Sequence, residues 1–425
     1  MGTQLDMATQ PDMATQRIVA DVLIPGRGEP IEHGTVVVDP TVGPRGMITY
    51  AGPTAEAPAA EDGESTTEVA AALPGLWDCH SHFVGMPQPN IETIAMTEPV
   101  TAAARATDDL RAVLDGGITS TREVGGMGLH LSAAIAEGRI PGPHVHAAGR
   151  ILSTTGGHGD LHGFPIEAVH QLLCNHSFSI LCDGVPEVLK AVRLNLRSNA
   201  KLIKVCASGG VMSEVDHPMH QQFSDEELAA IVGEAARAER IVAAHCHGKA
   251  GIMAAIRAGC HTVEHGSFLD EEAAEAMAEK GTMFVPTRFV VDALLGSPEN
   301  LPAYVYEKGQ MVAGAHEQAM KIAIAKGVKI ASGCDIFVSG QFYGQGTREI
   351  LHLINAGLTD LEAIEAATAT APETLGPQAP VSGQLRVGYD ADVTAIDTNP
   401  LDDRSVWGDA DRVTHVWKSG AMVKG

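Results

Sequence analysis

The chain has 425 residues, 44% of them hydrophobic, so it is long enough for one large domain and a smaller one, each with its own core. Its 29 basic and 53 acidic residues give a net charge of −24, which makes nucleic acid and anionic membrane surfaces poor partners, because both require a basic face. The seven cysteines are odd in number and contain no CxxC pair, a pattern that predicts reduced, buried thiols in a cytoplasmic protein.

The two ends of the chain share one kind of patterning. Residues 1–16 repeat the letters DMATQ and are expected to be a flexible leader outside the fold. Residues 17–72 contain short runs of β-forming residues separated by Gly and Pro turns, which predict a small sheet layer. Residues 378–425 return to this patterning, so the two segments are expected to form one discontinuous β-sandwich domain. No apolar run approaches the roughly 18 residues of a membrane span.

Residues 73–377 alternate between apolar strand-like runs and amphipathic helical stretches. The strand candidates are 76–80, 117–125, 143–149, 201–210, 240–248, 261–267, 282–287 and 328–335. The helical stretches between them include 101–116, 184–199, 224–239, 250–258, 270–280 and 303–326. Ser224 and Glu227 form a capping-box pattern at the start of one helix. Eight such repeats predict a (β/α)8 TIM-type barrel, whose active site lies at the carboxyl ends of the strands.

Polar residues stand at those expected strand ends. The segment "LPGLWDCHSHF" ends in His80 and His82, whose side chains share one face of a strand and can clamp one metal ion. Taken alone, this pair fits a solvent-facing loop equally well. The later strand candidates add four more side chains that can become metal ligands: Lys204, His245, His265 and Asp335.

Each of these six residues has a common structural alternative. A core histidine often bonds a backbone carbonyl, an aspartate often caps a helix, and a lysine can extend to the surface. All six, however, fall at successive strand ends of one predicted barrel, and this joint placement favours a metal centre. Neutral imidazoles and carboxylates are ligands that suit Zn²⁺.

The same residues resemble those of the amidohydrolase superfamily in its binuclear-metal form, and the resemblance covers nearly the whole chain. It implies that His80, His82 and Asp335 hold the more buried ion and that His245 and His265 hold the more exposed one. It also implies that Lys204 is carboxylated and bridges two Zn²⁺ ions. In this family a metal-bridging hydroxide attacks the amide carbonyl, which makes Asp335 the catalytic base and then the acid for the leaving nitrogen.

A narrower resemblance rests on the segments "STTGGHGD", "AHCHGKAGIMAAI" and "GQLRVGYDADV". They are similar to the branch that holds ochratoxinases and Xaa-Pro dipeptidase or carboxypeptidase-like amidohydrolases. The branch implies a small amide substrate with a free carboxylate, either ochratoxin A, cleaved to ochratoxin alpha and phenylalanine, or an N-acyl amino acid or dipeptide. His158 and His247 are then expected to bind the substrate, or alternatively to orient metal ligands. Similar proteins often form homo-oligomers, octamers among them.

Two other functions stay open at this point: a cyclic-amide or imidazolone hydrolase, and a non-catalytic oligomeric scaffold, which the complete ligand set disfavours. Arg122 and Glu123 could serve the pocket or form a structural ion pair, and His144 and His146 are interpreted as structural. Residues 288–306 are expected to form an apolar loop, either a lid over an aromatic substrate or a packing and contact surface.

Overall fold

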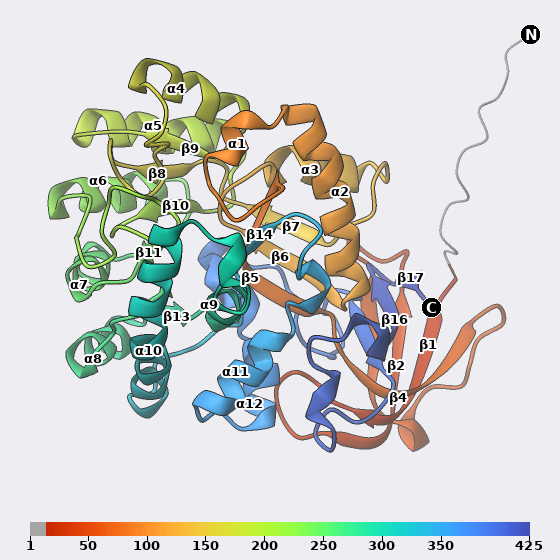
Figure 1. Ribbon diagram of the computed structural model, residues 1–425. Helices are drawn as coiled ribbons and strands as arrows, with labels where there is room; N and C mark the ends of the chain where they lie inside the picture. The colour runs from red at the N-terminus through yellow and green to blue at the C-terminus, as the bar shows by residue number, and fades with distance from the viewer. Residues whose placement is uncertain (1–13) are drawn as a thin grey trace, which may run out of the picture.

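The computed structural model of the protein describes residues 14–425, so residues 1–13 of the expected leader lie outside the described residues. Strand β1 (Gln16–Leu23) already begins at the last leader position. Figure 1 shows a barrel surrounded by helices, with a sheet built from both ends of the chain lying against one side of it.

The barrel wall follows the eight predicted strands, seven of them as β-strands and the last, 328–335, as an extended segment with one isolated bridge between Phe284 and Ile330. They are β5 (Leu76–Met86), β6 (Ile118–Glu123), β7 (His144–Ala147) continued by β8 (Ile151–Ser153), β10 (Ile203–Cys206), β11 (Val242–Cys246), β12 (Thr262–His265), β13 (Met283–Val285) and a last segment, 329–335, that leads into β14 (Ile336–Val338). The wall consists of two sheets of parallel strands, in the orders β13-β12-β11-β10-β8-β9 and β14-β5-β6-β7. Strand β9 (Ser179–Leu181) extends the first sheet beyond β8.

Backbone hydrogen bonds close the wall where these two sheets meet. The Lys201 N–H donates to the Ala147 carbonyl on one side, and the Ala331 N–H donates to the Phe284 carbonyl on the other. The Asp335 N–H then donates to the His80 carbonyl, which joins the last segment to β5. The predicted (β/α)8 barrel is confirmed, and its strand ends converge as that fold requires.

Helices cover the outside of the barrel and line its mouth. They are α1 (Thr93–Met96), α2 (Pro99–Asp115), α3 (Gly128–Ala136), α4 (Ile166–Asn175), α5 (Val185–Arg197), α6 (Asp225–Ala236), α7 (Lys249–Ala258), α8 (Glu271–Lys280), α9 (Arg288–Leu295), α10 (Ala303–Ala325), α11 (Arg348–Ala356) and α12 (Asp360–Ala366). The six predicted helices are confirmed to within a few residues. The capping box is present too, with the Ser224 hydroxyl accepting from the Glu227 N–H and the Glu227 carboxylate accepting from the Ser224 N–H.

The prediction of a loop over 288–306 was wrong, because α9 and the start of α10 occupy most of this segment. The beginning of α9 is stabilised from far along the chain. Glu349 of α11 accepts hydrogen bonds from the Arg288 and Phe289 N–H groups, at 2.9 and 2.7 Å. These are two of the N–H groups that lack a partner within a helix. Because the capping carboxylate is about sixty residues away, the local sequence gives no start signal.

The two ends of the chain meet in one seven-stranded sheet, in the order β17-β16-β15-β4-β1-β2-β3. Its strands besides β1 are β2 (Ile31–Asp39), β3 (Met47–Pro53), β4 (Ser65–Pro74), β15 (Val393–Ile396), β16 (Val413–Lys418) and β17 (Ala421–Lys424). The strands were expected to form a sandwich, and they belong to one continuous hydrogen-bonded sheet. Strand β4 runs two residues past the expected boundary at 72 before β5 begins.

This sheet is apolar on both faces. Leu23 of β1 and Ala72 of β4 belong to its own core, whereas their neighbours on the same strands, Val22 and Leu73, pack into the core of the barrel. The sheet is therefore held against the barrel by side chains that alternate along the same strands. Among residues 14–425, no helix is both long and apolar enough to cross a membrane.

Candidate metal centre and substrate cavity

His80, His82 and Asp335 form a compact group at one end of the barrel. The Asp335 Oδ1 atom lies 3.5 Å from His80 Nε2 and 3.2 Å from His82 Nε2. Their ligand atoms all lie within 4.8 Å of one another, so one cation fits among them. Asp335 has a left-handed backbone, with φ at 58°, a conformation that costs a non-glycine residue free energy and is concentrated at functional sites.

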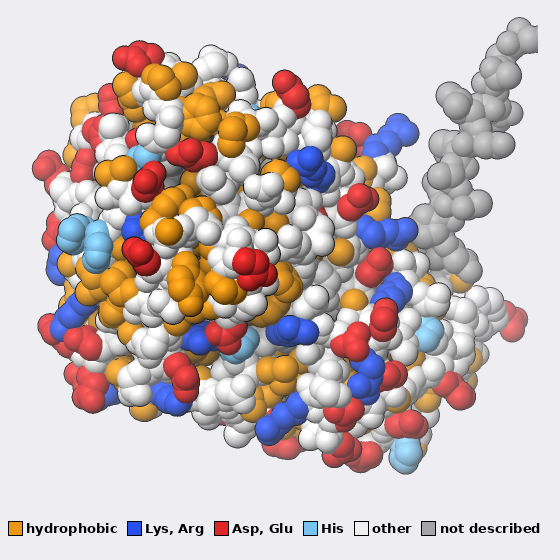
Figure 2. Space-filling view, in the orientation of Figure 1, with side chains coloured by type: hydrophobic (Ala, Val, Ile, Leu, Met, Phe, Trp, Pro, Cys, Tyr) orange, Lys and Arg blue, Asp and Glu red, His pale blue; other side chains and the backbone are white. Residues whose placement is uncertain are grey.

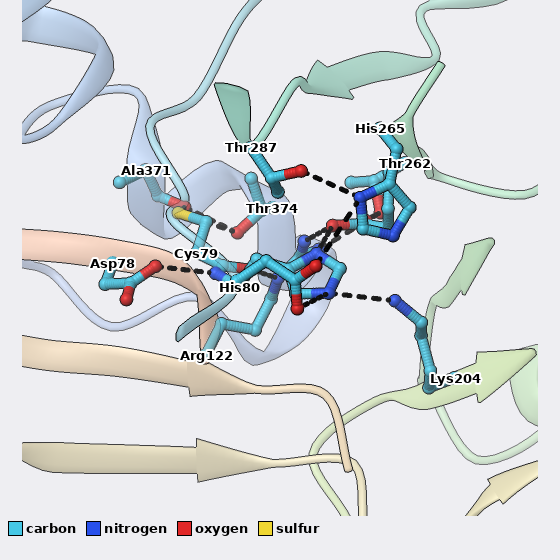
Figure 3. Close-up of polar contacts among 12 residues, drawn as sticks. Asp78, Cys79, His80, Arg122, Lys204, Thr262, His265, Thr287, Ala371 and Thr374 are labelled. Carbon is cyan, nitrogen blue, oxygen red and sulfur yellow. Dashed lines mark hydrogen bonds and ion pairs between the residues drawn. The ribbon is translucent and has the colours of Figure 1, made fainter. Parts of the chain in front are cut away.

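Lys204 points into this group from β10. Figure 3 shows its side chain directed at His80, and its Nζ atom lies 3.3 Å from His80 Nε2. The side chain is buried. Burial lowers the pKa of the Lys204 amine, because the ammonium form loses its hydration. The neutral form of the amine, which burial favours, is the form from which an anionic carbamate ligand can be made.

His245 and His265 complete the predicted set of six. Ring centroids lie 4.8 Å apart for His80 and His265 and 4.6 Å apart for His245 and His265. The structure thus brings all six predicted ligands into one cluster. Burial lowers the pKa of His80 to about 4 and lowers the pKa of His245 and His265 well below its usual value. The three imidazoles are therefore neutral at pH 7, the form that binds metal ions.

Each histidine uses one ring nitrogen for a protein contact and leaves the other for a ligand. The His80 Nδ1–H donates to Glu264 and the His82 Nδ1–H to the Gly125 carbonyl, both at 2.8 Å. The His245 Nε2–H donates to the Gly209 carbonyl at 3.2 Å, and His265 Nδ1 is hydrogen-bonded to the Thr287 hydroxyl at 2.7 Å. Such partners fix the tautomer and orientation of metal-binding histidines. The residues present therefore fit a metal centre.

Glu264 and Arg122 form a fully buried ion pair beneath the cluster, and the sequence interpretation did not include Glu264. The Arg122 Nη2 atom lies 2.6 Å from Glu264 Oε2, the same oxygen that accepts from His80. Since β6 and β12 are not neighbours in the wall, this pair crosses the barrel interior. Burial acts to raise the pKa of Glu264, but the Arg122 guanidinium and His80 hold it well below its ordinary value.

Arg122 thus forms a structural ion pair, but its partner is Glu264, so the predicted pairing of Arg122 with Glu123 was wrong. Glu123 contacts a different part of the protein, where it accepts a hydrogen bond from the Gly128 N–H at 3.0 Å. Burial raises the pKa of Glu123 to about 7. The available signal for Glu264 was a charged residue inside a strand otherwise expected to be buried, directly before His265.

Asp78 links the two segments that carry three of the predicted ligands. Its Oδ1 atom accepts hydrogen bonds from the His80 N–H at 2.9 Å and the Cys334 N–H at 3.0 Å. It therefore fixes β5 against the segment that ends in Asp335. All seven cysteines of the chain fall within the described residues and are free thiols, and all except Cys174 are buried.

His144 and His146 lie at the opposite end of their strand from the cluster and contact other parts of the protein. His144 Nε2 lies 3.4 Å from Asp392 of the terminal domain, and the His146 ring stacks on Trp77 with centroids 5.3 Å apart. Their structural interpretation is confirmed.

A cavity opens above the cluster and is apolar on most of its lining. The lining includes the six predicted ligands, His158 and His247. Helices α9 and α10 form one wall with Val290, Val291, Leu294, Leu295, Val305 and Val312, and Ile91, Ile94, Ile151, Phe178, Met212 and Phe337 line other parts. Figure 2 shows hydrophobic side chains gathered in the middle of the face where α9 and α10 lie in Figure 1. The residues of the expected apolar loop thus border the site as a helical wall.

His158 and His247 also reach the cavity. The His158 ring stacks on His245 with centroids 4.2 Å apart, and the His247 ring lies 4.7 Å from the same residue. His158 Nδ1 contacts the Ser213 hydroxyl and His247 Nδ1 contacts the Ser267 hydroxyl, both at 2.8 Å. In each ring this contact leaves Nε2 for another partner. Burial lowers the pKa of His158 to about 4 and of His247 to about 3.

A (β/α)8 barrel with clustered histidines, an aspartate and a buried lysine at its strand ends defines a metal-dependent hydrolase. Comparison with known proteins gives the particular family: residues 71–423 match the amidohydrolase family, and the chain belongs to it. The chain is therefore a hydrolase whose site is built for metal-dependent amide hydrolysis.

Individual relatives cover nearly all of the chain. Ochratoxinase of Aspergillus niger is 44% identical over 426 residues, which span 96% of this chain and 86% of the relative. The crystal structure of A. niger ochratoxinase matches with a TM-score of 0.88 and 43% identity, covering 97% of this chain and 96% of that one. A prolidase crystallised with N-methylphosphonate-L-proline matches with a TM-score of 0.88 and 32% identity, covering 97% and 100%. The predicted resemblance to the branch of ochratoxinases and Xaa-Pro dipeptidases is confirmed.

Proposed function

We propose that the chain binds two Zn²⁺ ions and hydrolyses the amide bond to a C-terminal amino acid, with ochratoxin A or an N-acyl amino acid or dipeptide as substrate. The observation that carries the proposal is the meeting of six predicted ligands in one cluster beneath an apolar cavity. The 44% identity to ochratoxinase supports the choice of substrate. Homo-oligomer formation and a cytoplasmic location stay predictions.

The ligand assignment is the one that the family resemblance implies, and the compact group of His80, His82 and Asp335 supports it. His80, His82 and Asp335 would hold one ion and His245 and His265 the other, with carboxylated Lys204 between them. When bound, the ions polarise a carbonyl oxygen and lower the pKa of a shared water. Although burial opposes it, the neighbouring His80 and His82 keep the pKa of Asp335 below its ordinary value. Asp335 thus enters the reaction as a carboxylate able to accept a proton and pass it to the leaving nitrogen.

The cavity lining supports a substrate that is apolar on its acyl side. Val290, Leu294 and Val305 present aliphatic carbon to whatever enters, so burial of an aromatic acyl group against them is favourable. Among the described lining residues, Lys204 is the one Lys or Arg, and in this proposal it is carboxylated. The free carboxylate or the carbonyl oxygen of the substrate would therefore meet the imidazoles of His158 and His247. His247 can donate from Nε2–H as a neutral ring if Ser267 donates to its Nδ1, whereas His158, whose Nδ1–H is held by Ser213, donates from Nε2 as the imidazolium that an adjacent carboxylate favours.

The test is hydrolysis of ochratoxin A, N-acyl-phenylalanine and Xaa-Pro dipeptides by the zinc-loaded protein, with the released amino acid as readout. We expect release of phenylalanine from ochratoxin A and its loss on chelation, regained when zinc is added back. No hydrolysis of any open-chain amide by protein that holds two zinc ions would contradict the proposal and leave cyclic amides as the substrates to assay.

A further inference from the structure

A lysine from α10 is inserted into the loop that follows β10. The Lys308 Nζ atom donates to the carbonyls of Ser213 at 2.6 Å and Asp216 at 2.5 Å. It also donates to the carbonyls of Gly210 at 3.4 Å and Glu214 at 3.3 Å. Four backbone carbonyls of residues 210–216, which we call the clamp loop, thus surround one ammonium group. Such a coordination shell fixes the path of an otherwise irregular segment.

The carboxylate of Asp216 closes the clamp loop from within. It accepts hydrogen bonds from the Gly210 N–H at 2.8 Å, from the Ser213 hydroxyl and from the Gln222 amide at 3.2 Å, and it lies 3.5 Å from Lys308 Nζ. The side chains of Asp216 and Lys308 are only 5% and 13% exposed. A charge pair this protected from water is worth more than an exposed one, and removal of one member leaves the other poorly solvated.

The clamp loop holds the ring of His158. The Ser213 hydroxyl gives its proton to Asp216, so it accepts the hydrogen bond from His158 Nδ1–H at 2.8 Å. This contact leaves His158 Nε2 as the nitrogen available to the cavity. Gly210 allows the ring to lie directly against the backbone, because a Cβ atom at that position would lie only 2.1 Å from His158 Nδ1. The ring is thus held by the clamp loop on one side and by His245 on the other.

Lys308 also joins two walls of the cavity. Its neighbours Val305 and Gly309 line the α10 side, and Val211 and Met212 line the side formed by the clamp loop. The only covalent path between these walls runs through almost a hundred residues. The ammonium–carbonyl contacts therefore connect them directly across the mouth of the barrel.

We infer that Lys308 is a positioning residue, which fixes the orientation of His158 toward the substrate by holding the clamp loop through Asp216 and Ser213. The inference rests on the proposed function, because it gives His158 a substrate to meet. The alternative is that Lys308 only fastens α10 to the barrel and that the His158 ring keeps its position without it.

A double-mutant cycle separates these two roles. We expect Lys308→Met to lower kcat/KM for N-acyl-phenylalanine about tenfold while the zinc content stays at the wild-type value, because outer partners of site histidines typically contribute 10- to 100-fold. Ser213→Ala should lower kcat/KM to a similar degree. The kcat/KM of the double variant should be no lower than that of the more impaired single variant. Lys321→Met on the same helix, which removes an exposed pair with Glu317, is the control and should match wild type. Losses that multiply, or wild-type kcat/KM in Lys308→Met, would overturn the inference.

A second readout does not depend on turnover. In zinc-loaded protein with ¹⁵N-labelled histidine, the His158 Nδ1–H signal is assigned by its loss in His158→Asn. Lys308→Met should shift or broaden this signal as Ser213→Ala does, and an unchanged signal would overturn the inference even if activity falls. If wild type hydrolyses none of the amides, the proposed function fails while the signal still decides the positioning role. If Lys308→Met does not fold, Asp216→Asn takes its place with the same expectations.

Discussion

Glu264→Gln should be among the most damaging single substitutions outside the proposed ligands. The glutamine has the size of the glutamate, so His80 Nδ1 keeps an acceptor, but Arg122 loses its anionic partner at a site where both side chains are 0% exposed. Loss of one member of a buried ion pair typically costs about 3–5 kcal/mol. We expect the free energy of unfolding to fall by that amount, and the zinc affinity to fall about 10- to 100-fold as His80 is held less firmly. Urea unfolding and zinc titration measure the two effects.

Two further variants separate this explanation from a general effect of substitution. Glu279→Gln, on the exposed side of α8, should change stability by less than about 0.5 kcal/mol. The double variant Arg122→Met with Glu264→Gln removes both charges, so it should be more stable than the sum of the single losses indicates. A loss below about 1 kcal/mol in Glu264→Gln, or strict additivity in the double variant, would refute the reasoning.

Three other substitutions test separate parts of the site. Lys204→Ala should abolish metal-dependent hydrolysis, and full activity with two metals still bound, measured by elemental analysis, would end the carbamate argument. His247→Ala should lower turnover while metal content stays near wild type; a metal-free variant would instead make His247 a ligand. Glu349→Ala removes the acceptor for two N–H groups at the start of α9, so it should cost about 1–2 kcal/mol and raise KM for N-acyl-phenylalanine through a looser cavity wall, and an unchanged KM would contradict that role.

The barrel and the clustering of the six proposed ligands were predictable because both depend on local periodicity. Strand candidates could be recognised as apolar runs, and the barrel rule then placed His80, Lys204 and His265 at one end without any knowledge of distances. The same argument placed Asp335, although its left-handed backbone is invisible in the sequence. Local signals therefore suffice for residues whose position follows from the strand they occupy.

The partners of these ligands could not be predicted, because they come from across the barrel. Glu264 is one residue before His265, yet its contact with Arg122 spans two strands that are not adjacent. The cap of α9 by Glu349 and the insertion of Lys308 into the clamp loop likewise join segments separated by about sixty and ninety residues. Such contacts depend on how distant segments pack against one another, and a single sequence does not specify that packing.

The site divides into a polar floor and an apolar wall that come from different elements. Strand ends supply the floor, where His80, His265 and Asp335 are held by buried partners. Helices α9 and α10 and the clamp loop supply the wall, which is anchored by Glu349 and Lys308. Changes to the floor should therefore alter metal content and kcat, whereas changes to the anchors should alter substrate affinity and the orientation of His158 with the metal retained. On this division, substrate preference can change through the anchors while the hydrolytic chemistry stays the same.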